Sequence, residues 1–460
     1  MKPWTIISAL TGCIAVCSFA IHQQNDDPVP IPSSPQRTGG DPQKGYDYLV
    51  NGDYIRSGLP YNFYLLGFGA DSNNYLARTG INTKIAHSFT AVKAANGETV
   101  VAPNCLQCHA QVFDGKLIVG LGNSLADFTQ SKTLDVKNMV LLENMLKLQS
   151  PKGFEAAREF IRASKAITAQ LYAPVKGVNV ADRLAALLVS HRAPTSFNWS
   201  DEAALDVPAD LIPSDTPPWW LLKKKNAMFY NGFGRGDFGR FLMASNLLTV
   251  NDTTESAQVD AHMPDVLAYI YSLKPPKYPK AINQSLAVQG RVLFQKTCSG
   301  CHGSYGEQTM YPNLLIPESL IQTDSALYKS NYSAPQFVNW FNRSWFTQGS
   351  YPARLEPFEG YIAPPLDGIW VTAPYLHNGS VPTLDALLNS KLRPTYWSRN
   401  FDKPQYDYDK IGWKYAVETK GGSTSTYNTT LLGYGKGGHT FGDALSDKER
   451  KAVIEYLKTL

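Results

Sequence analysis

Two short segments of this chain each hold two cysteines and a histidine at the same spacing. They read Cys-Leu-Gln-Cys-His at residues 105–109 and Cys-Ser-Gly-Cys-His at residues 298–302. Two thiolates at this spacing can add to the two vinyl groups of one haem, while the adjacent histidine reaches the iron as an axial ligand. The spacing therefore predicts two covalently attached c-type haems. The predicted attachment residues are Cys105, Cys108, Cys298 and Cys301, with His109 and His302 as axial ligands.

Zinc binding is the main alternative for a pair of cysteines separated by two residues. A structural zinc site needs four cysteine or histidine ligands in a tetrahedral arrangement. The chain has six cysteines, and the two outside the motifs, Cys13 and Cys17, lie in an apolar N-terminal stretch. Because no further cysteine or histidine pair in the sequence completes a zinc site, we favour haem.

The overall composition sets broad limits on the class of protein. A chain of 460 residues is long enough for two to three domains. Its 25 Tyr, 20 Phe and 9 Trp indicate large flat surfaces to enclose. The net charge of +4 is too weak to indicate a nucleic-acid partner or an anionic membrane.

The N-terminal residues predict the compartment. An apolar stretch follows Lys2 and ends near Ala20, so we expect residues 1–20 to be an export signal or anchor. A lipoprotein box around Cys13 is the alternative to simple cleavage. Because c-type haem is attached outside the bacterial cytoplasm, we expect an exported, periplasmic protein. Residues 21–43, rich in Pro, Asp, Gln and Ser, are expected to form a flexible tether.

Each motif is followed, far downstream, by a similar amphipathic helix. We predict these helices at residues 264–273, stopped by prolines, and at residues 446–457, opened by a Ser-x-x-Glu capping box. Upstream of the second motif, Gly290 permits a close helix crossing, with Tyr456 as its aromatic partner. The shared pattern indicates one unit used twice, with a boundary in the proline-rich residues 274–279.

We therefore expect a mainly α fold of two cytochrome c-like haem domains with long ordered loops. Helical apolar spacing occurs at residues 138–149, 153–172 and 181–192, whereas residues 303–440 show little periodicity. The predicted division is a signal or anchor at 1–20, a tether at 21–43, an N-terminal haem domain at 44–278 and a C-terminal haem domain at 279–460.

The sixth ligand of each iron decides what that iron can do. An iron with two strong protein ligands is restricted to electron transfer, whereas a free position can bind peroxide or dioxygen. For the second haem we predict His439, which lies between glycines just before the last helix. His377, which starts a His-Asn-Gly turn, is the alternative as a ligand or as a partner of backbone or propionate. Met310 is the remaining candidate.

The first haem is expected to keep an open face. His87, His191 and His262 are available, but none has a setting typical of a ligand. His191 ends an apolar helix, where the helix dipole favours a histidine without any haem. Methionines in this unit are more often core residues than ligands.

A pair of tryptophans, Trp219 and Trp220, lies between the two motifs on a stretch stiffened by prolines. An indole between two porphyrins can relay electrons or line a pocket. The alternative is a buried aromatic pair at a domain seam. Phe233 and Phe238 follow on a glycine-rich run and are candidates for an apolar pocket wall.

Together with further blocks of sequence, these motifs resemble the dihaem peroxidase superfamily, which includes bacterial cytochrome c peroxidases and MauG-type enzymes. The RoxA-like branch of rubber oxygenases is the most similar. The resemblance runs from about residue 43 to the end of the chain. The blocks that carry it are residues 104–109, 115–123, 219–226, 363–370 and 373–380.

The resemblance implies two mostly helical cytochrome c units whose haems are bridged across the domain interface by aromatic residues. It makes the haem on His109 catalytic, with Trp219 and Trp220 beside it, and the haem on His302 a six-coordinate relay whose second ligand matches His439. Calcium is a further candidate cofactor, with no identifiable ligands. The chain is short for a rubber oxygenase and shows no clear distal carboxylate or amide for acid/base help.

From these features we expect an exported dihaem oxidoreductase. Hydrogen peroxide or dioxygen would be the oxidant at the N-terminal haem, and a small cytochrome or copper protein would be a candidate electron donor. The alternative is a non-catalytic electron-transfer cytochrome, which needs a second strong ligand for the first haem, such as His191 or His87.

Overall fold

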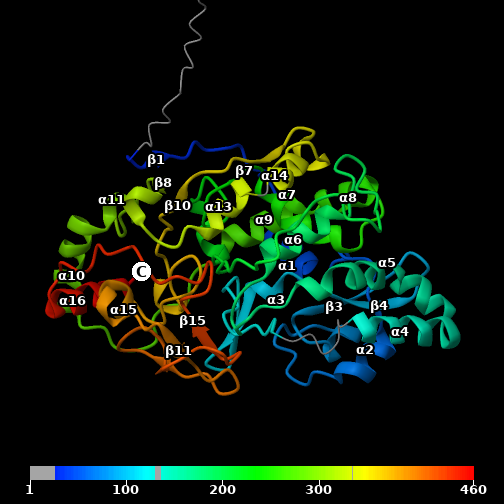
Figure 1. Ribbon diagram of the computed structural model, residues 1–460, viewed down its shortest axis with the longest axis horizontal. Helices are drawn as coiled ribbons and strands as arrows, with labels where there is room; N and C mark the ends of the chain where they lie inside the picture. The colour runs from blue at the N-terminus through cyan, green and yellow to red at the C-terminus, as the bar shows by residue number, and fades with distance from the viewer. Residues whose placement is uncertain (1–25, 130–135, 334) are drawn as a thin grey trace, which may run out of the picture.

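The computed structural model describes residues 26–129, 136–333 and 335–460 (Figure 1). The predicted signal and the first residues of the predicted tether, with Cys13 and Cys17, lie outside the described residues. Within the described part of the chain, no helix is long and apolar enough to cross a membrane.

The fold is mixed α/β, so the prediction of a mainly α protein is wrong. Helices make up 39% of the residues and strands 13%. The described strands form several small sheets of two or three strands. The strands were missed because they are short and their residues pair across loops, for example β3 (Phe89–Lys93) on β4 (Thr99–Pro103). Both strands are rich in Val and Thr, which fit a pleated sheet better than a helix.

The longer elements are as follows. The helices are α1 (Pro42–Asn51), α2 (Tyr61–Phe68), α4 (Val136–Gln149), α5 (Pro151–Ile167), α6 (Ala181–Ser190), α7 (Phe238–Leu242), α8 (Thr253–Asp260), α9 (Met263–Ser272), α10 (Gln284–Thr297), α13 (Ala326–Ser333), α14 (Pro335–Phe341), α15 (Leu384–Leu388) and α16 (Asp447–Leu457). The sheets are β1 (Val29–Pro30), β8 (Leu314–Pro317) and β10 (Gly360–Ile362); β2 (Leu59–Pro60) with β4 and β3; β5 (Ala110–Phe113) and β6 (Lys116–Val119); β7 (Gly234–Gly236) and β9 (Ala353–Leu355); β11 (Tyr396–Ser398), β14 (Ala416–Val417) and β15 (Thr426–Asn428); and β12 (Tyr406–Asp407) and β13 (Gly412–Trp413).

The predicted helix crossing in the C-terminal half is present. Helices α10 and α16 cross at Gly290, where a Cβ would lie 1.9 Å from the carbonyl oxygen of Ala452. Tyr456 is one turn further along α16 and packs on Phe294, with ring centroids 5.2 Å apart. Gly290 therefore permits the close approach, although its immediate neighbour is Ala452 and not Tyr456.

The N-terminal half repeats the same crossing with helices α1 and α9. A Cβ at Gly45 would lie 1.9 Å from the carbonyl oxygen of Asp265. Tyr269, one turn after Asp265, packs on Tyr46 with ring centroids 5.2 Å apart. In Figure 1, α10, α15 and α16 lie together at one end of the molecule, and α1 and α9 lie nearer its middle. Helix α1 was not predicted, because its start coincides with the end of the predicted tether.

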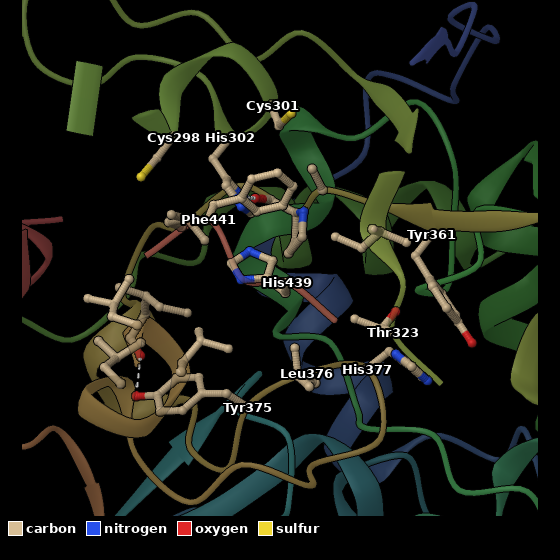
Figure 2. A pocket seen from close by; sticks show the side chains of 18 of the residues that line it. Cys298, Cys301, His302, Thr323, Tyr361, Tyr375, Leu376, His377, His439 and Phe441 are labelled. Carbon is tan, nitrogen blue, oxygen red and sulfur yellow. Dashed lines mark hydrogen bonds between the residues drawn. The ribbon is translucent and has the colours of Figure 1, made fainter. Parts of the chain in front are cut away.

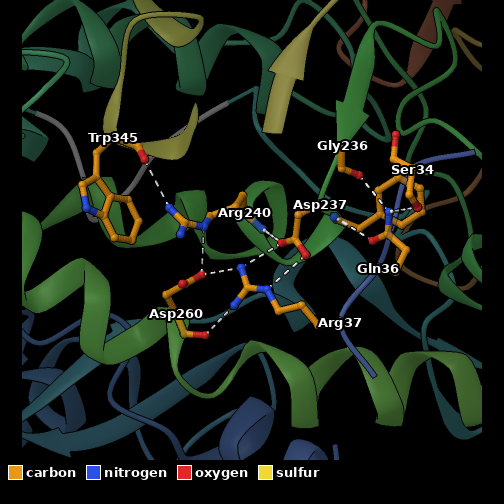
Figure 3. A network of polar contacts seen from close by, with 9 residues as sticks. Ser34, Gln36, Arg37, Gly236, Asp237, Arg240, Asp260 and Trp345 are labelled. Atoms are coloured by element: carbon orange, nitrogen blue, oxygen red, sulfur yellow. Dashed lines mark hydrogen bonds and ion pairs between the residues drawn. The ribbon is translucent and has the colours of Figure 1, made fainter. Parts of the chain in front are cut away.

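The N-terminal segment is packed against the molecule, so the tether prediction is wrong for residues 29–41. Strand β1 pairs with β8, and Ile31 is buried against Leu315. Arg37 bonds Asp237 at 2.8 and 3.0 Å and Asp260 at 2.6 Å (Figure 3). The composition of this segment gave no sign of the packing. A single buried arginine with two carboxylate partners fixes a segment that is otherwise polar and proline-rich.

Candidate haem sites

The C-terminal motif opens onto a cavity of about 190 Å³, which we call the haem cavity (Figure 2). Cys301 and His302 lie in the short helix α11 (Ser299–His302), and Cys298 caps its start directly after α10. Most of the remaining wall is apolar. Side chains from all parts of the C-terminal half line it, including Phe294, Ile316, Leu384, Leu388, Val453 and Leu457.

His302 is held in one tautomer by the backbone. Its Nδ1 lies 2.8 Å from the carbonyl oxygen of Pro364. A carbonyl only accepts, so Nδ1 carries the hydrogen and Nε2 keeps its lone pair. Burial lowers the pKa of His302. The ring is therefore neutral at physiological pH, as metal ligation requires.

His439 lies opposite His302 in the haem cavity. The two ring centroids are 6.0 Å apart and the rings are tilted by 57° (Figure 2). Two imidazoles that face each other across a cavity are a donor pair that would hold a haem iron from both sides. Burial lowers the pKa of His439 to about 3, so this ring is also neutral.

The loop that carries His439 is fixed by Arg393. The guanidinium of Arg393 donates to the carbonyl oxygens of Lys436 at 2.8 Å, Gly438 at 2.6 Å and His439 at 3.0 Å. Gly438 has φ +69°, and a Cβ there would lie 2.2 Å from the backbone of Gln322. His439 itself has φ +46°. A non-glycine residue in this conformation needs support from its surroundings, which Arg393 supplies.

His377 lines the same cavity but is placed differently from His439. Its ring stacks on Tyr361, with centroids 3.9 Å apart and an interplanar angle of 16°. In Figure 2 it lies with Thr323 on the far side of the cavity from Cys298 and Cys301. Burial lowers its pKa to about 3.

Two polar atoms of this far wall are unsatisfied. His377 Nε2 and Thr323 Oγ1 are buried without a hydrogen-bond partner in the described structure. Buried polar groups rarely stay unpaired. The carboxylates of a haem lie on the edge opposite the vinyl groups that react with cysteine. The cavity therefore has three features that fit a c-type haem. Two thiols lie on one side, two imidazoles face each other, and unpaired polar atoms lie on the side opposite the thiols. Met310 is exposed and takes no part.

The N-terminal motif has the same residues in tighter surroundings. Cys105 caps the short helix α3 (Leu106–His109), and strand β5 follows. The ring of His109 stacks on Trp219, with centroids 4.5 Å apart and an interplanar angle of 18°. Burial lowers the pKa of His109 to about 3, so its ring is neutral. Its Nδ1 is buried and has no partner within the described ranges.

The cavity beside Cys105 measures only about 20 Å³. Trp219, Met243, Ser245 and Met263 are among the residues that line it, whereas Cys108 and His109 are not. The thiols and imidazole are the donor types that a c-type haem needs, but the space beside them is largely filled. Insertion of a porphyrin here requires these side chains to move apart.

The other histidines of the N-terminal half are engaged elsewhere. His191 stacks on Trp199 at 4.9 Å, and its Nδ1 lies 2.9 Å from the carbonyl oxygen of Ser200. His262 is exposed and stacks on Tyr48 at 3.9 Å. His87 is half-buried, with its ring edge-on to Tyr75. No described histidine faces His109 as His439 faces His302.

Trp219 and Trp220 connect the surroundings of the two motifs. Gly120 donates its N–H to the carbonyl of His109 and accepts the N–H of Trp219 at 2.8 Å. Trp219 packs in the hydrophobic cluster of the N-terminal half, and Trp220 packs in that of the C-terminal half. Trp220 donates its Nε1–H to the carbonyl of Asp367 at 2.8 Å. That loop also carries Pro364, the partner of His302. Phe233 and Phe238 are buried in the first cluster.

Sequence reasoning missed the residues that orient the ligands. Pro364 and Arg393 act through a backbone carbonyl and a guanidinium, and neither has a spacing that marks it. The glycines around His439 were the only usable signal. For calcium, the described residues contain no group of three or more His, Cys, Asp or Glu suited to hold a metal ion.

Comparison with known proteins supports a cytochrome. A family described as RoxA-like, cytochrome c-like matches residues 360–398, which include Pro364, His377 and Arg393. This match implies a c-type haem with its iron. The chain is 32% identical over 253 residues to the uncharacterized protein y4iJ of Sinorhizobium fredii, covering 41% of each chain. It is 27% identical over 296 residues to the uncharacterized protein y4iM of the same organism, covering 55% of this chain and 66% of the relative. The chain thus spans less than two thirds of each relative, and its similarity to the RoxA-like family lies in the wall of the haem cavity.

Proposed function

We propose that the chain is an exported dihaem oxidoreductase of the peroxidase or oxygenase type. One haem would be attached at each motif. The haem on His302 would be closed by His439 and would store or relay electrons. The haem on His109 would keep one face free for peroxide or dioxygen. The observation that carries the proposal is the unequal setting of the two histidines: His302 faces a second imidazole at 6.0 Å and His109 faces none among the described histidines.

The residues of this chain would contribute position and electrostatics. Cys298 and Cys301 would hold the second haem covalently, and the iron would supply one-electron chemistry when bound. Pro364 fixes the tautomer of His302, and Arg393 holds the loop of His439. His377 and Thr323 offer unpaired polar atoms to the haem carboxylates.

Trp219 and Trp220 are the proposed link between the two irons. They are adjacent in the chain and belong to different hydrophobic clusters. Trp219 touches the proposed ligand His109, and Trp220 bonds the loop that orients His302. One ring contact, one covalent step along the chain and one hydrogen bond would then form the route for electrons. A small cytochrome or copper protein in the periplasm is the proposed electron donor.

A non-catalytic electron-transfer cytochrome is the second candidate. It is favoured by the small cavity beside Cys105, which Met243 and Met263 line. Methionine thioether is an established axial ligand in cytochromes c. If either methionine closed the first iron, both irons would be restricted to electron transfer.

Electron paramagnetic resonance of the ferric holoprotein tests the proposal. We expect one low-spin and one high-spin signal, of which only the high-spin signal responds to cyanide or peroxide. A protein with two low-spin haems that ignores both ligands would contradict the enzyme. Peroxide turnover with reduced cytochrome c, run beside oxygen uptake on an isoprenoid, then separates the peroxidase from the oxygenase.

A further inference from the structure

A second cavity, of about 530 Å³, lies beside the haem cavity and has no part in the proposed function. We call it the side cavity. Helices α6 and α13 contribute to its lining, with parts of residues 207–212 and 231–233. It shares a thin wall with the haem cavity. Tyr230 and Thr323 line the haem cavity, and the residues that directly follow them, Asn231 and Asp324, line the side cavity.

The side cavity contains an unsatisfied hydrogen-bond acceptor. Asn231 is only 2% exposed, and its Oδ1 has no hydrogen-bond partner in the described part of the chain. An unpaired buried acceptor is costly and is normally matched by a donor. A ligand that enters the cavity with a hydroxyl group would supply that donor.

Half of the residues that line the side cavity are apolar, and two of these are aromatic. Phe233 and Phe337 supply two aromatic rings, and Ala186 and Leu327 supply aliphatic surface. Aromatic side chains favour a flat aromatic ligand over a branched aliphatic one, because rings gain from stacked or edge contacts. Apolar surface that alternates with a few placed polar groups is typical of small-molecule sites.

The charges of the side cavity disfavour an acidic ligand. Its lining has two basic residues. Arg183 donates to the carbonyl oxygens of Pro208 and Ala209 and is thereby committed, and Lys329 is exposed. Three aspartates, Asp182, Asp210 and Asp324, also line the cavity. An acidic ligand would meet this carboxylate excess without a free buried cation to offset it.

We propose that the side cavity binds a neutral aromatic alcohol, with its hydroxyl donated to Asn231 Oδ1 and its ring against Phe233 and Phe337. This site is distinct from both haem sites, and its occupancy does not depend on what either iron does. A phenol-type molecule held there lies one layer of side chains from the haem cavity.

Binding of 1-naphthol to the holoprotein, measured by equilibrium dialysis, tests the proposal. 1-Methoxynaphthalene keeps the rings but lacks the hydroxyl donor and is the ligand control. We expect 1-naphthol to bind at least fivefold more tightly than 1-methoxynaphthalene, since one buried hydrogen bond is at stake. Asn231→Leu should weaken 1-naphthol by about tenfold and leave 1-methoxynaphthalene nearly unchanged.

Two further variants separate a change in binding at the side cavity from a general effect of substitution on folding. Ala186→Phe fills the side cavity from α6 and should abolish binding of both naphthalenes. Asn251→Leu replaces an exposed asparagine outside the cavity and should leave both affinities unchanged. Haem content and the absorption spectrum, recorded for each variant, report separately on the haem sites.

Three outcomes would overturn the proposal. They are equal affinities of the wild type and Asn231→Leu for 1-naphthol, equal affinities of the wild type for the two naphthalenes, and unchanged binding in Ala186→Phe. A protein without an open iron that still discriminates 1-naphthol through Asn231 would retain the side cavity and lose only the catalytic function proposed above.

Discussion

The two C-x-x-C-H motifs lie in different surroundings although the helix pairs that frame them are alike. Gly45 on α1 and Gly290 on α10 each bring a helix to within contact of a backbone carbonyl, and a tyrosine one turn later packs on the crossing. The second motif directly follows its helix, whereas strands and a further helix separate the first motif from α1. The cavities differ accordingly, at about 190 and 20 Å³.

This difference shows that the residues of each motif and the residues that face its histidine come from separate parts of the chain. The motif fixes two thiols and one imidazole. Whether a second imidazole arrives depends on a distant loop, which in the C-terminal half is held by Arg393 and Gly438. In the N-terminal half, Ser245 and Met243 line the space beside Cys105.

The largest expected effect comes from removing one pair of thiols. Cys105→Ala/Cys108→Ala and Cys298→Ala/Cys301→Ala should each lower the covalent haem from two to one per chain. Haem that resists acid–acetone extraction, counted as pyridine haemochrome, measures this. The two double variants are controls for each other. One haem per wild-type chain would mean that only one motif attaches haem, which would contradict the proposal of two haem sites.

Replacement of His439 should alter only the second haem. His439→Ala should convert its ferric signal from low-spin to high-spin, because the opposing imidazole is lost. His377→Ala should keep the low-spin signal, since that ring stacks on Tyr361 away from His302. Electron paramagnetic resonance of both variants decides whether His439 or His377 is the second ligand. The opposite result would move the ligand to His377.

The matched glycines test whether the two helix crossings are equivalent. Gly45→Ala and Gly290→Ala should each destabilise the protein by about 3 kcal/mol, because a methyl group cannot fit against a backbone carbonyl. Denaturant unfolding followed by circular dichroism measures both. Gly67→Ala in α2, where an added Cβ meets nothing within 4 Å, is the control. A large loss of stability at only one of the two glycines would show that the two crossings are alike in geometry but not in their contribution to stability.

The smallest expected effect is a pH dependence confined to the haem cavity. Burial raises the pKa of Asp215 to about 7, partly offset by a hydrogen bond from Tyr230. The unfolded carboxyl loses its proton near pH 4, so between the two values the folded state holds more protons and stability falls as pH rises. From pH 5 to 6.5 this amounts to about 2 kcal/mol.

Asp215→Asn removes that ionisation while keeping the shape of the side chain. The variant should therefore lose the decline between pH 5 and 6.5 in denaturant unfolding. No carboxyl lines the cavity beside Cys105 in the described structure, so no matching effect is expected there. An equal slope in variant and wild type would show that Asp215 is ionised throughout.

Many of the helices could be predicted because a long amphipathic helix shows a regular spacing of apolar residues in the sequence. The helices predicted at 138–149, 181–192, 264–273 and 446–457 correspond to α4, α6, α9 and α16. The helix predicted over 153–172 ends earlier, since α5 stops at Ile167. The mixed α/β class was missed because strands of two to five residues have too few residues to show a period, and some of them, such as β1 and β7, pair with strands far away in the chain.

The candidate site was predictable only in part, for a similar reason. His439 was singled out by its glycines and its position before the last helix, and it lies across from His302. The small size of the cavity beside Cys105 could not be predicted from the sequence, because Trp219, Met243 and Met263 come from three separate segments.

The residues alone were enough to predict covalent haem attachment, because thioether attachment needs two thiols and a histidine at a fixed local spacing. They were also enough to predict the amphipathic helices, because the apolar periodicity of these helices is local. Only the tertiary structure decided which imidazole faces which, how much space each motif has, and that residues 29–41 are tied down through Arg37. Those properties depend on contacts between residues more than a hundred positions apart, whose packing energies leave no pattern in either segment alone.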